Sequence, residues 1–307
     1  MSHELLVNWQ IDVQAYGELQ YDVALSQHTT LAVGGNARFY FKPKSIEALQ
    51  QSLPIIPQDM ELFVLGRGSN LLISDNGFDG LILDLGCLQS LAMNQATLRT
   101  EAGCRMSKIA QKAASMGYAG LEFMATVPGD LGGGVAMNAG AFGQQVSDTL
   151  QHIDIIDRDG NLSILPREQL AMHYRHTVLS HDSIVVSASF LLQEDDANDI
   201  RMRMRDMRQQ RSQSQPLALP NCGSVFKNPD NDYAARLIEA VGLKGEQRGQ
   251  AQISEVHANF IVNHGGATAN DVLALIRCAQ SRVQQQFQIY LEPEVRMLGS
   301  MDKENIS

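Results

Sequence analysis

An α+β fold in three parts is predicted by the pattern of short apolar segments along the 307 residues. Strand-like segments surround one helical segment between residues 37 and 85, and shorter, paired strand-like segments follow between residues 90 and 193. A polar helical stretch then leads into a third group of mixed helices and strands. Mixed helices and strands without a regular β–α alternation are typical of the α+β class.

The first part, residues 1–85, is expected to be one small unit. Apolar residues with a period of two predict strands at 37–43, 61–66 and 80–85, and residues 45–53 have a helical pattern. The second part, residues 86–198, contains a helix at 106–117 and a hairpin at 153–165. Asp159-Gly160 is a strong turn signal at the centre of that hairpin.

Residues 195–216 are polar, have a helical composition and end at Pro216. We expect a connecting helix and linker over residues 199–219. The third part, residues 220–307, then contains strands at 223–226, 258–266 and 290–299, a helix at 233–242, and a long helix capped by Thr268. No internal repeat is visible.

Charge and cysteine content exclude several classes of function. A net charge of −10 and a pI near 5.2 argue against a general nucleic-acid or anionic-membrane binder, so an anionic ligand would need a locally positive pocket. The cysteines are scattered and predict neither a disulfide framework nor a thiolate zinc site. They are Cys87, Cys104, Cys222 and Cys278. No apolar stretch is long enough to span a bilayer, and no signal peptide is evident, so we expect a cytoplasmic protein.

Two glycine-rich stretches are candidate ligand sites. In 64–75, "VLGRGSNLLISD", Gly66 and Gly68 invite a dinucleotide-fold interpretation, but Leu71 stands where the third glycine belongs. An ordinary tight turn remains the alternative there. The second stretch, "VPGDLGGGVAMNAGAFG" at 127–143, exposes many backbone N–H groups and lets a flat cofactor approach the main chain. Two such stretches are suited to a pyrophosphate held without a Rossmann helix.

Two other patterns have ordinary explanations. His173, His176 and His181 lack accompanying acidic or cysteine ligands in a loop-like segment, so no metal is expected. The arginines of the polar helix are interleaved with methionine and aspartate, and a solvent-facing helix is the default interpretation. They are Arg201, Arg203, Arg205, Arg208 and Arg211.

Ser224, in "CGSVFKNP", could be a nucleophile, a phosphate ligand, a proton donor or a turn residue. Phe226 stands where a G-x-S-x-G elbow needs its second glycine, which disfavours hydrolase chemistry. Arg175 in "HYRH" and the charged residues of "LEPEVR" could equally form structural ion pairs.

Taken together, the motifs resemble one family. "TTLAVGG", "LGRGSNLLISD", "GLEF", "VPGDLGGGVAMNAGA", "YR", "CGSVFKNP" and "LEPEVR" occur in the order found in the UDP-N-acetylenolpyruvoylglucosamine reductases, the MurB flavoenzymes of bacterial cell-wall synthesis. The resemblance covers about residues 28–298. It implies two N-terminal subdomains that bind FAD noncovalently, like the vanillyl-alcohol-oxidase-like (PCMH) flavoproteins, and a C-terminal substrate domain.

The resemblance also implies a reaction. NADPH reduces the flavin, and the enolpyruvyl ether of UDP-N-acetylglucosamine then accepts hydride at its methylene carbon and a proton at the neighbouring carbon. It implies that Arg175 binds the substrate carboxylate, that Ser224 donates the proton and that Glu294 assists. The implied FAD-binding residues are Gly66, Arg67, Gly68, Ser69, Asn70, Pro128, Gly129, Gly132, Gly133, Asn138 and Gly140. The implied substrate-binding residues are Tyr174, Arg211, Lys227 and Asn228.

The chain departs from the family pattern at three places. His28 replaces an asparagine, Thr126-Val127 replaces Gly-Ile, and Asp130 replaces a small hydroxyl residue. The short stretch between Arg175 and Ser224 resembles the shorter family form without a tyrosine-bearing loop, and we expect a monomer or weak oligomer without membrane insertion. A different flavin-dependent oxidase and a non-enzymatic nucleotide-sugar binder remain the alternatives; the first would not need "GSVFKNP", and the second would need no flavin.

Overall fold

The computed structural model describes residues 9–301, which divide into two compact units. The first unit runs to Tyr21 and continues over Phe39–Gly66 and Gly80–Gln210. The second takes in Asp22–Arg38, Arg67–Asp79 and the chain from Arg211 onward. The predicted boundaries after residues 85 and 198 therefore both fall inside the first unit.

A four-stranded sheet has the order β1-β2-β5-β3, and it confirms the three strands predicted in this region. Its strands are β1 (Gly17–Ala24), β2 (Asn36–Pro43), β5 (Phe78–Asp84) and β3 (Leu62–Leu65). β3 and β5 are parallel. The helix α2 (Ile46–Ser52) begins where the Ser45 hydroxyl accepts a hydrogen bond from the Ala48 N–H. Its Leu49 packs into the same core as Phe39, Phe41 and Leu81.

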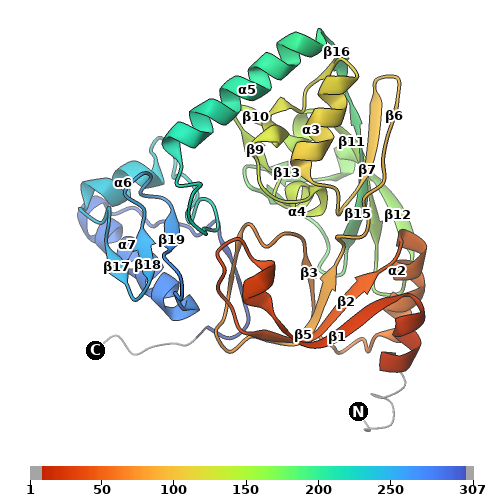
Figure 1. Ribbon diagram of the computed structural model, residues 1–307, viewed down its shortest axis with the longest axis horizontal. Coiled ribbons are helices and arrows are strands. Elements are labelled where there is room, and N and C mark those ends of the chain that lie inside the picture. Colours follow the sequence, from red (N-terminus) through yellow and green to blue (C-terminus); the bar gives the residue numbers. More distant parts are fainter. Residues whose placement is uncertain (1–8, 302–307) are drawn as a thin grey trace. The chain divides into compact units, whose positions relative to one another are not determined.

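The first unit also contains a five-stranded antiparallel sheet (Figure 1). In order, its strands are β12 (Leu162–Pro166), β11 (Leu150–Ile156), β15 (Ile184–Leu191), β7 (Thr97–Glu101) and β6 (Leu91–Asn94). The predicted hairpin is confirmed as β11 and β12, joined through Gly160 at φ 82°. Every residue of β15 from Ile184 to Phe190 is buried, which explains its almost continuous apolar sequence.

The predicted helix at 106–117 is confirmed as α3 (Met106–Ser115). Met106, Ile109, Ala110 and Ala113 form its buried stripe and pack with strand residues such as Leu98 and Phe190. Minor two-stranded pairs also belong to this unit. They include β8 (Tyr118–Ala119) with β16 (Gln193–Glu194), and β9 (Gly140–Ala141) with β10 (Gln144–Gln145).

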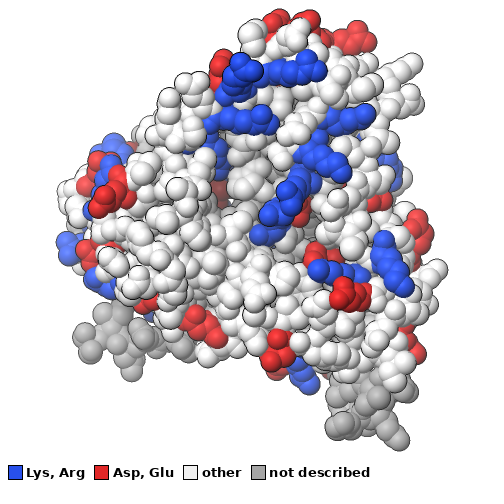
Figure 2. Space-filling model, in the orientation of Figure 1, with Lys and Arg blue, Asp and Glu red and all other residues white. Residues whose placement is uncertain are grey.

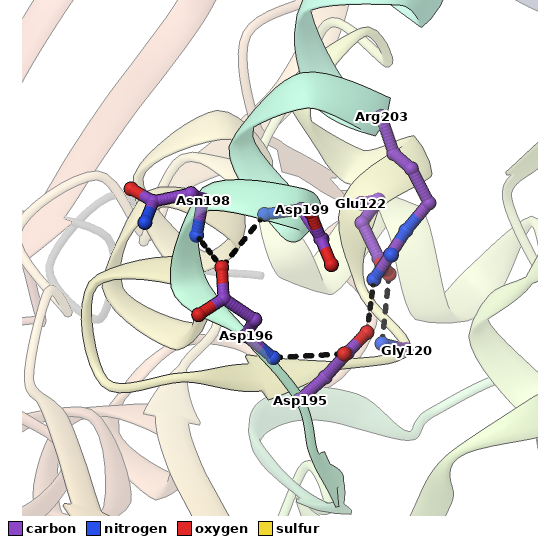
Figure 3. A network of polar contacts seen from close by, with 7 residues as sticks. All are labelled: Gly120, Glu122, Asp195, Asp196, Asn198, Asp199 and Arg203. Atoms are coloured by element: carbon purple, nitrogen blue, oxygen red, sulfur yellow. Dashed lines mark hydrogen bonds and ion pairs between the residues drawn. The ribbon is translucent and has the colours of Figure 1, made fainter.

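The polar helix α5 (Ala197–Ser214) is not solvent-facing along its whole length, which corrects the sequence interpretation at Arg203. The Arg203 guanidinium binds the carboxylate of Glu122, whose side chain is 3% exposed, and also reaches Asp195 at 2.6 Å (Figure 3). Glu122 accepts a further hydrogen bond from the Gly120 N–H at 2.7 Å. A charged side chain in a polar helix thus anchors that helix to the first unit.

The second unit combines C-terminal elements with two earlier segments. Its antiparallel sheet consists of β17 (Gln247–Arg248), β18 (Ala251–Ile253) and β19 (Ile261–Asn263), with helices α6 (Ala234–Ala240) and α7 (Ala269–Phe287). β4 (Leu71–Ile73) pairs in parallel with β20 (Arg296–Leu298). Leu31, Val33 and Leu72 are buried in the core formed by residues from Cys222 onward.

The long C-terminal helix begins as predicted. Thr268 and Asp271 of α7 form a reciprocal capping box, in which each side chain accepts a hydrogen bond from the other residue's backbone N–H. Its buried residues Val272, Ile276, Ala279 and Val283 follow the helical period.

One predicted strand is wrong, and another is shorter than expected. Residues 223–226 make only an isolated bridge, from Phe226 to Pro293, and within 290–299 only Arg296–Leu298 form a strand. Residues 223–226 form part of their backbone hydrogen bonds with a side chain rather than with a second strand, as described below, so a regular ladder cannot form. Within residues 9–301, no helix combines the length and apolar character needed to cross a bilayer.

Candidate functional site

The second glycine-rich stretch is not a simple loop, because it contains the short helix α4 (Leu131–Ala136). Before this helix, the stretch runs beside the segment that leads from β7 into α3. The Met106 N–H donates to the Gly129 carbonyl, and the N–H groups of Leu131 and Gly132 donate to the carbonyls of Cys104 and Ala102, at 2.9 to 3.2 Å. The stretch is therefore held against the five-stranded sheet by its own backbone.

Its glycines serve different physical purposes. Gly129 has φ 117°, which only glycine adopts readily. A Cβ on Gly132 would lie 3.2 Å from the Cβ of Ala102, so this glycine allows close packing within the protein. A Cβ on Gly133 would meet no atom within 4 Å. Open space beside Gly133 leaves the backbone accessible to a flat ligand.

Arg175 lies in a tight hairpin of the first unit. β13 (Met172–His173) and β14 (His176–Thr177) are antiparallel, and Tyr174 and Arg175 form the turn between them. Arg175 adopts the left-handed conformation with φ 57°. Its guanidinium carbon lies 5.0 Å from the centre of the Tyr174 ring, a cation–π distance. Both predicted substrate-binding side chains of this hairpin therefore occur together at its tip.

Asn138 connects the glycine-rich stretch to this hairpin. Its side-chain amide donates to the His173 carbonyl at 3.0 Å and to Gln145 at 3.1 Å, and its carbonyl oxygen accepts from the Ser147 N–H at 3.0 Å. Thr177 adds a second link, since its hydroxyl donates to the Val135 carbonyl of α4. Both amide hydrogens of Asn138, a predicted FAD-binding residue, have partners within the protein, where they support the Arg175 hairpin.

The first glycine-rich stretch lies at a boundary between the two units, because Gly66 belongs to the first and Arg67–Asn70 to the second. Gly68 has φ 60°, and a Cβ there would lie 2.4 Å from the His28 carbonyl oxygen. Asn70 donates from its side chain to the Glu294 carbonyl at 3.0 Å and accepts from the Arg296 N–H at 3.0 Å. Two predicted FAD-binding residues, Gly68 and Asn70, therefore also serve internal packing.

Ser224 is half-buried and follows a constrained turn in the second unit. The Gly223 N–H donates to the Asn221 side chain at 3.0 Å, and Gly223 has φ 76°. The Thr30 hydroxyl donates to the Asn221 carbonyl at 2.7 Å. The "TTLAVGG" segment therefore fixes the turn that precedes the serine.

The backbone after Ser224 is paired with the segment that carries Glu294. The Val225 carbonyl accepts from the N–H groups of Glu294 and Val295, at 2.8 and 3.2 Å, and the Lys227 N–H donates to the Glu292 carbonyl at 2.9 Å. Ser224 and Glu294 are thus brought onto adjacent segments of one unit. Their pairing could not be predicted from sequence spacing.

Electrostatics in this region favour a protonated thiol. Burial raises the pKa of Cys222 to about 12, and the negative charge of Glu294 acts in the same direction. A thiol that is protonated at neutral pH is a poor nucleophile, so Cys222 is not a candidate for covalent catalysis.

Lys227 and Asn228 have partners within the second unit. The Lys227 ammonium binds Glu292 at 2.6 Å, and the Asn228 side chain accepts from the Ala234 N–H at the start of α6. Arg211 lies in the last turn of α5 and belongs to the second unit, whereas the Tyr174–Arg175 turn belongs to the first. The predicted site residues are therefore divided between the two units.

Positive charge gathers over α3 and α5 of the first unit on the face drawn in Figure 2. Exposed cations of these helices include Arg105, Lys108, Arg201, Arg205 and Arg208. In a chain with net charge −10, this local concentration raises the probability of encounter with an anionic ligand.

His173 and His176 face each other in the β13–β14 hairpin, which is a paired segment rather than the loop expected from sequence. Within residues 9–301 no cluster of three or more His, Cys, Asp or Glu side chains is arranged to hold a metal ion.

Comparison with known proteins covers almost the whole chain. Residues 37–165 match a family model described as an FAD binding domain, and residues 215–298 match one described as the C-terminal domain of UDP-N-acetylenolpyruvoylglucosamine reductase. Two curated relatives bear the name UDP-N-acetylenolpyruvoylglucosamine reductase. The one from Halalkalibacterium halodurans is 42% identical, and the one from Synechococcus elongatus is 45% identical; each match covers 92% of this chain and 95% of the relative. The crystal structure of the corresponding reductase (MurB) from Thermus caldophilus has a TM-score of 0.79 at 34% identity, covering 92% of this chain and 99% of that one.

Proposed function

The chain belongs to the UDP-N-acetylenolpyruvoylglucosamine reductase family, and from that premise we propose that it reduces the enolpyruvyl ether of UDP-N-acetylglucosamine to UDP-N-acetylmuramate, with FAD as cofactor and NADPH as hydride donor. The observation that carries the proposal is identity above 40% to two such reductases over 92% of the chain. The reaction supplies a peptidoglycan precursor.

The glycine-rich backbone fits a flavin dinucleotide. The open space beside Gly133 supports contact with a flat ligand, and Gly66, Arg67 and Ser69 add a second glycine-bearing segment. We assign noncovalent FAD binding to both stretches, with Pro128, Gly129, Gly132 and Gly140 shaping the second one. Bound at these stretches, FAD would supply the redox chemistry that carries hydride from NADPH to the substrate's methylene carbon.

Arg175 provides the positive charge that this reduction requires. Hydride addition to the methylene carbon moves negative charge onto the neighbouring carbon and its carboxylate. A guanidinium can bind that carboxylate through two parallel hydrogen bonds, which fix its orientation as well as its charge. The Asn138 and Thr177 contacts support this assignment, because they hold the hairpin of Arg175 in one conformation.

Ser224 completes the reaction by donating its hydroxyl proton to the carbon next to the carboxylate. The paired backbone at Val225 supports this role, because it holds the serine in a defined turn beside the Glu294 segment. Glu294 assists by hydrogen bonding near the developing charge. Tyr174, Arg211, Lys227 and Asn228 are assigned to the nucleotide-sugar part of the substrate.

An anaerobic experiment tests the proposal in two steps. The purified protein should be yellow, and acid should release FAD into the supernatant. NADPH should then bleach the flavin absorbance, and the enolpyruvyl substrate should restore it, whereas UDP-N-acetylglucosamine, which lacks the enolpyruvyl group, should not. Colourless protein that takes up no FAD would favour a nucleotide-sugar binder, and failure of the enolpyruvyl substrate to restore absorbance would favour a different flavin oxidase.

We also propose that the protein acts in the cytoplasm as a monomer or weak oligomer. Both UDP-linked sugars and NADPH are cytoplasmic metabolites, which supports that location. Light scattering at micromolar concentration measures the oligomeric state, and a mass above twice 33.7 kDa would contradict this part of the proposal.

A further inference from the structure

A buried asparagine replaces a strand partner next to Ser224. The side-chain amide of Asn259 donates to the Phe226 carbonyl at 2.8 Å, and its carbonyl oxygen accepts from the Phe226 N–H at 2.9 Å. The backbone carbonyl of Asn259 also accepts from the Val225 N–H at 2.9 Å. One residue thus makes three hydrogen bonds to the two residues that follow Ser224.

This arrangement is buried and has no alternative partners in water. Asn259 is 4% exposed, and Val225 and Phe226 are 1% and 2% exposed. If the amide were removed, the N–H and carbonyl groups of Phe226 would remain buried without a hydrogen bond, which is unfavourable. The backbone would have to shift to satisfy them.

The opposite edge of the same segment is also held. The Val225 carbonyl accepts two hydrogen bonds from the Glu294–Val295 backbone. Asn259 and residues 292–295 therefore hold the segment after Ser224 from two sides. Because Ser224 immediately precedes this segment, a change in its ψ angle would move the Val225 N–H and strain its hydrogen bond to Asn259.

We propose that Asn259 is a positioning residue for proton transfer from Ser224. This inference rests on the proposed function of Ser224 as proton donor. Asn259 acts through the backbone: its amide fixes Val225 and Phe226, and the fixed backbone aims the serine hydroxyl. A displacement near 1 Å in such an arrangement can reduce a rate by about 10²-fold.

The second unit contains a matched control. Asn263 is 2% exposed, donates from its amide to the Leu31 carbonyl at 3.0 Å, and accepts from the N–H groups of Gly265 and Ala267 at 2.8 and 3.1 Å. Its side chain is therefore buried and hydrogen-bonded like that of Asn259, but none of these side-chain bonds reaches Ser224 or the two residues that follow it.

The experiment measures both half-reactions by stopped-flow absorbance in holoenzymes of wild type, Asn259→Ala, Asn263→Ala, Ser224→Ala and Asn259→Ala/Ser224→Ala. In Asn259→Ala, NADPH should reduce the flavin at the wild-type rate, while reoxidation by the enolpyruvyl substrate slows by about 10²-fold at saturating substrate. Asn263→Ala should reoxidise at the wild-type rate despite a similar loss of stability. Adding Asn259→Ala to Ser224→Ala should slow reoxidation no further, because the two residues act through one hydroxyl.

The inference is overturned if Asn259→Ala reoxidises normally, if Asn259→Ala and Asn263→Ala are slowed equally, or if the double variant is much slower than Ser224→Ala. Failure of the underlying function looks different. In that case the wild type itself would not reoxidise with the enolpyruvyl substrate, or Ser224→Ala would reoxidise normally. If Asn259→Ala does not fold, Asn259→Ser, which retains one hydrogen-bonding hydroxyl, replaces it with the same expected split between half-reactions.

Discussion

Replacing Arg203 by alanine should destabilise the first unit, although this arginine lies in a helix whose composition is typical of a solvent-facing one. The change removes the cationic partner of Glu122, whose side chain is 3% exposed, and also ends the contact with Asp195 (Figure 3). Removing one partner of a buried ion pair typically costs about 3–5 kcal/mol, because the remaining charge stays buried.

Two features of the structure reduce that figure. The Gly120 N–H still donates to Glu122 at 2.7 Å, and the Arg203 side chain is 41% exposed, so water already screens the pair. We therefore expect a loss of about 2–3 kcal/mol in the free energy of unfolding. For a unit of this size, that loss lowers the melting temperature by roughly 4–12 °C.

The assay is thermal and urea unfolding followed by circular dichroism, with Arg205→Ala as control. Arg205 is exposed on the same helix and forms no ion pair with any residue in the described part of the chain, so its replacement should change stability by about 0.5 kcal/mol or less. In Glu122→Gln/Arg203→Ala the two effects should be less than additive. If Arg203→Ala and Arg205→Ala were equally stable, the ion pair would not anchor α5.

Four further outcomes are expected. Ser224→Ala should leave flavin reduction by NADPH unchanged and slow reoxidation by about 10²-fold or more, and Ser224→Cys should retain more activity than alanine; equal impairment of both half-reactions would indicate a structural role. Arg175→Lys should slow the same reoxidation step although the charge is retained, and a wild-type rate would argue against carboxylate binding by two hydrogen bonds. At pH 8 a thiol reagent should modify the exposed Cys87 quickly but should modify Cys222 only after unfolding, because burial raises the pKa of Cys222 to about 12. Labelling is measured by mass spectrometry, and rapid labelling of Cys222 in the native protein would contradict its burial. Burial, aided by the charge of Lys244, lowers the pKa of His257 from its ordinary value of 6.5. The neutral imidazole therefore contributes fully to stability above pH 6.5, and this contribution is lost as the pH falls below that value. In His257→Asn the urea midpoint should depend less on pH between about 7.5 and 5, and an unchanged dependence would contradict the assignment.

Local sequence signals predicted the helices well. The expected helices at 45–53, 106–117 and 233–242 correspond to α2, α3 and α6, because caps and apolar periods act within a few residues. The strand expected at 223–226 is absent as a ladder. Its apolar pattern is real, and Val225 and Phe226 are buried, but Asn259 replaces the second strand with a side-chain amide. No pattern in residues 223–226 contains that information.

Sequence reasoning also could not show which site residues lie together. Ser224 and Glu294 adjoin because the Val225 carbonyl accepts from the Glu294 N–H, a contact between distant parts of the chain. The resemblance assigns Asn138 to FAD binding, but it gives no sign that the Asn138 amide donates to the His173 carbonyl, 35 residues further along the chain. The structural role of Asn138 is indicated by its buried side chain and its φ of 39°, and only the structure provides these two observations.

The second unit consists of chain segments separated by segments of the first unit, and this arrangement determines when the chain can finish folding during synthesis. Within residues 9–301, the chain passes from one unit to the other after Tyr21, Arg38, Gly66, Asp79 and Gln210. Leu31, Val33 and Leu72 are synthesised early, but the next residue of their core along the sequence is Cys222. About half of the chain must therefore be synthesised before these apolar side chains can be buried. Such delayed, long-range contacts slow folding and expose apolar surface to chaperones and aggregation. For the same reason, a fragment that ends before Cys222 would lack most of this core, and β4 would have no β20 to pair with.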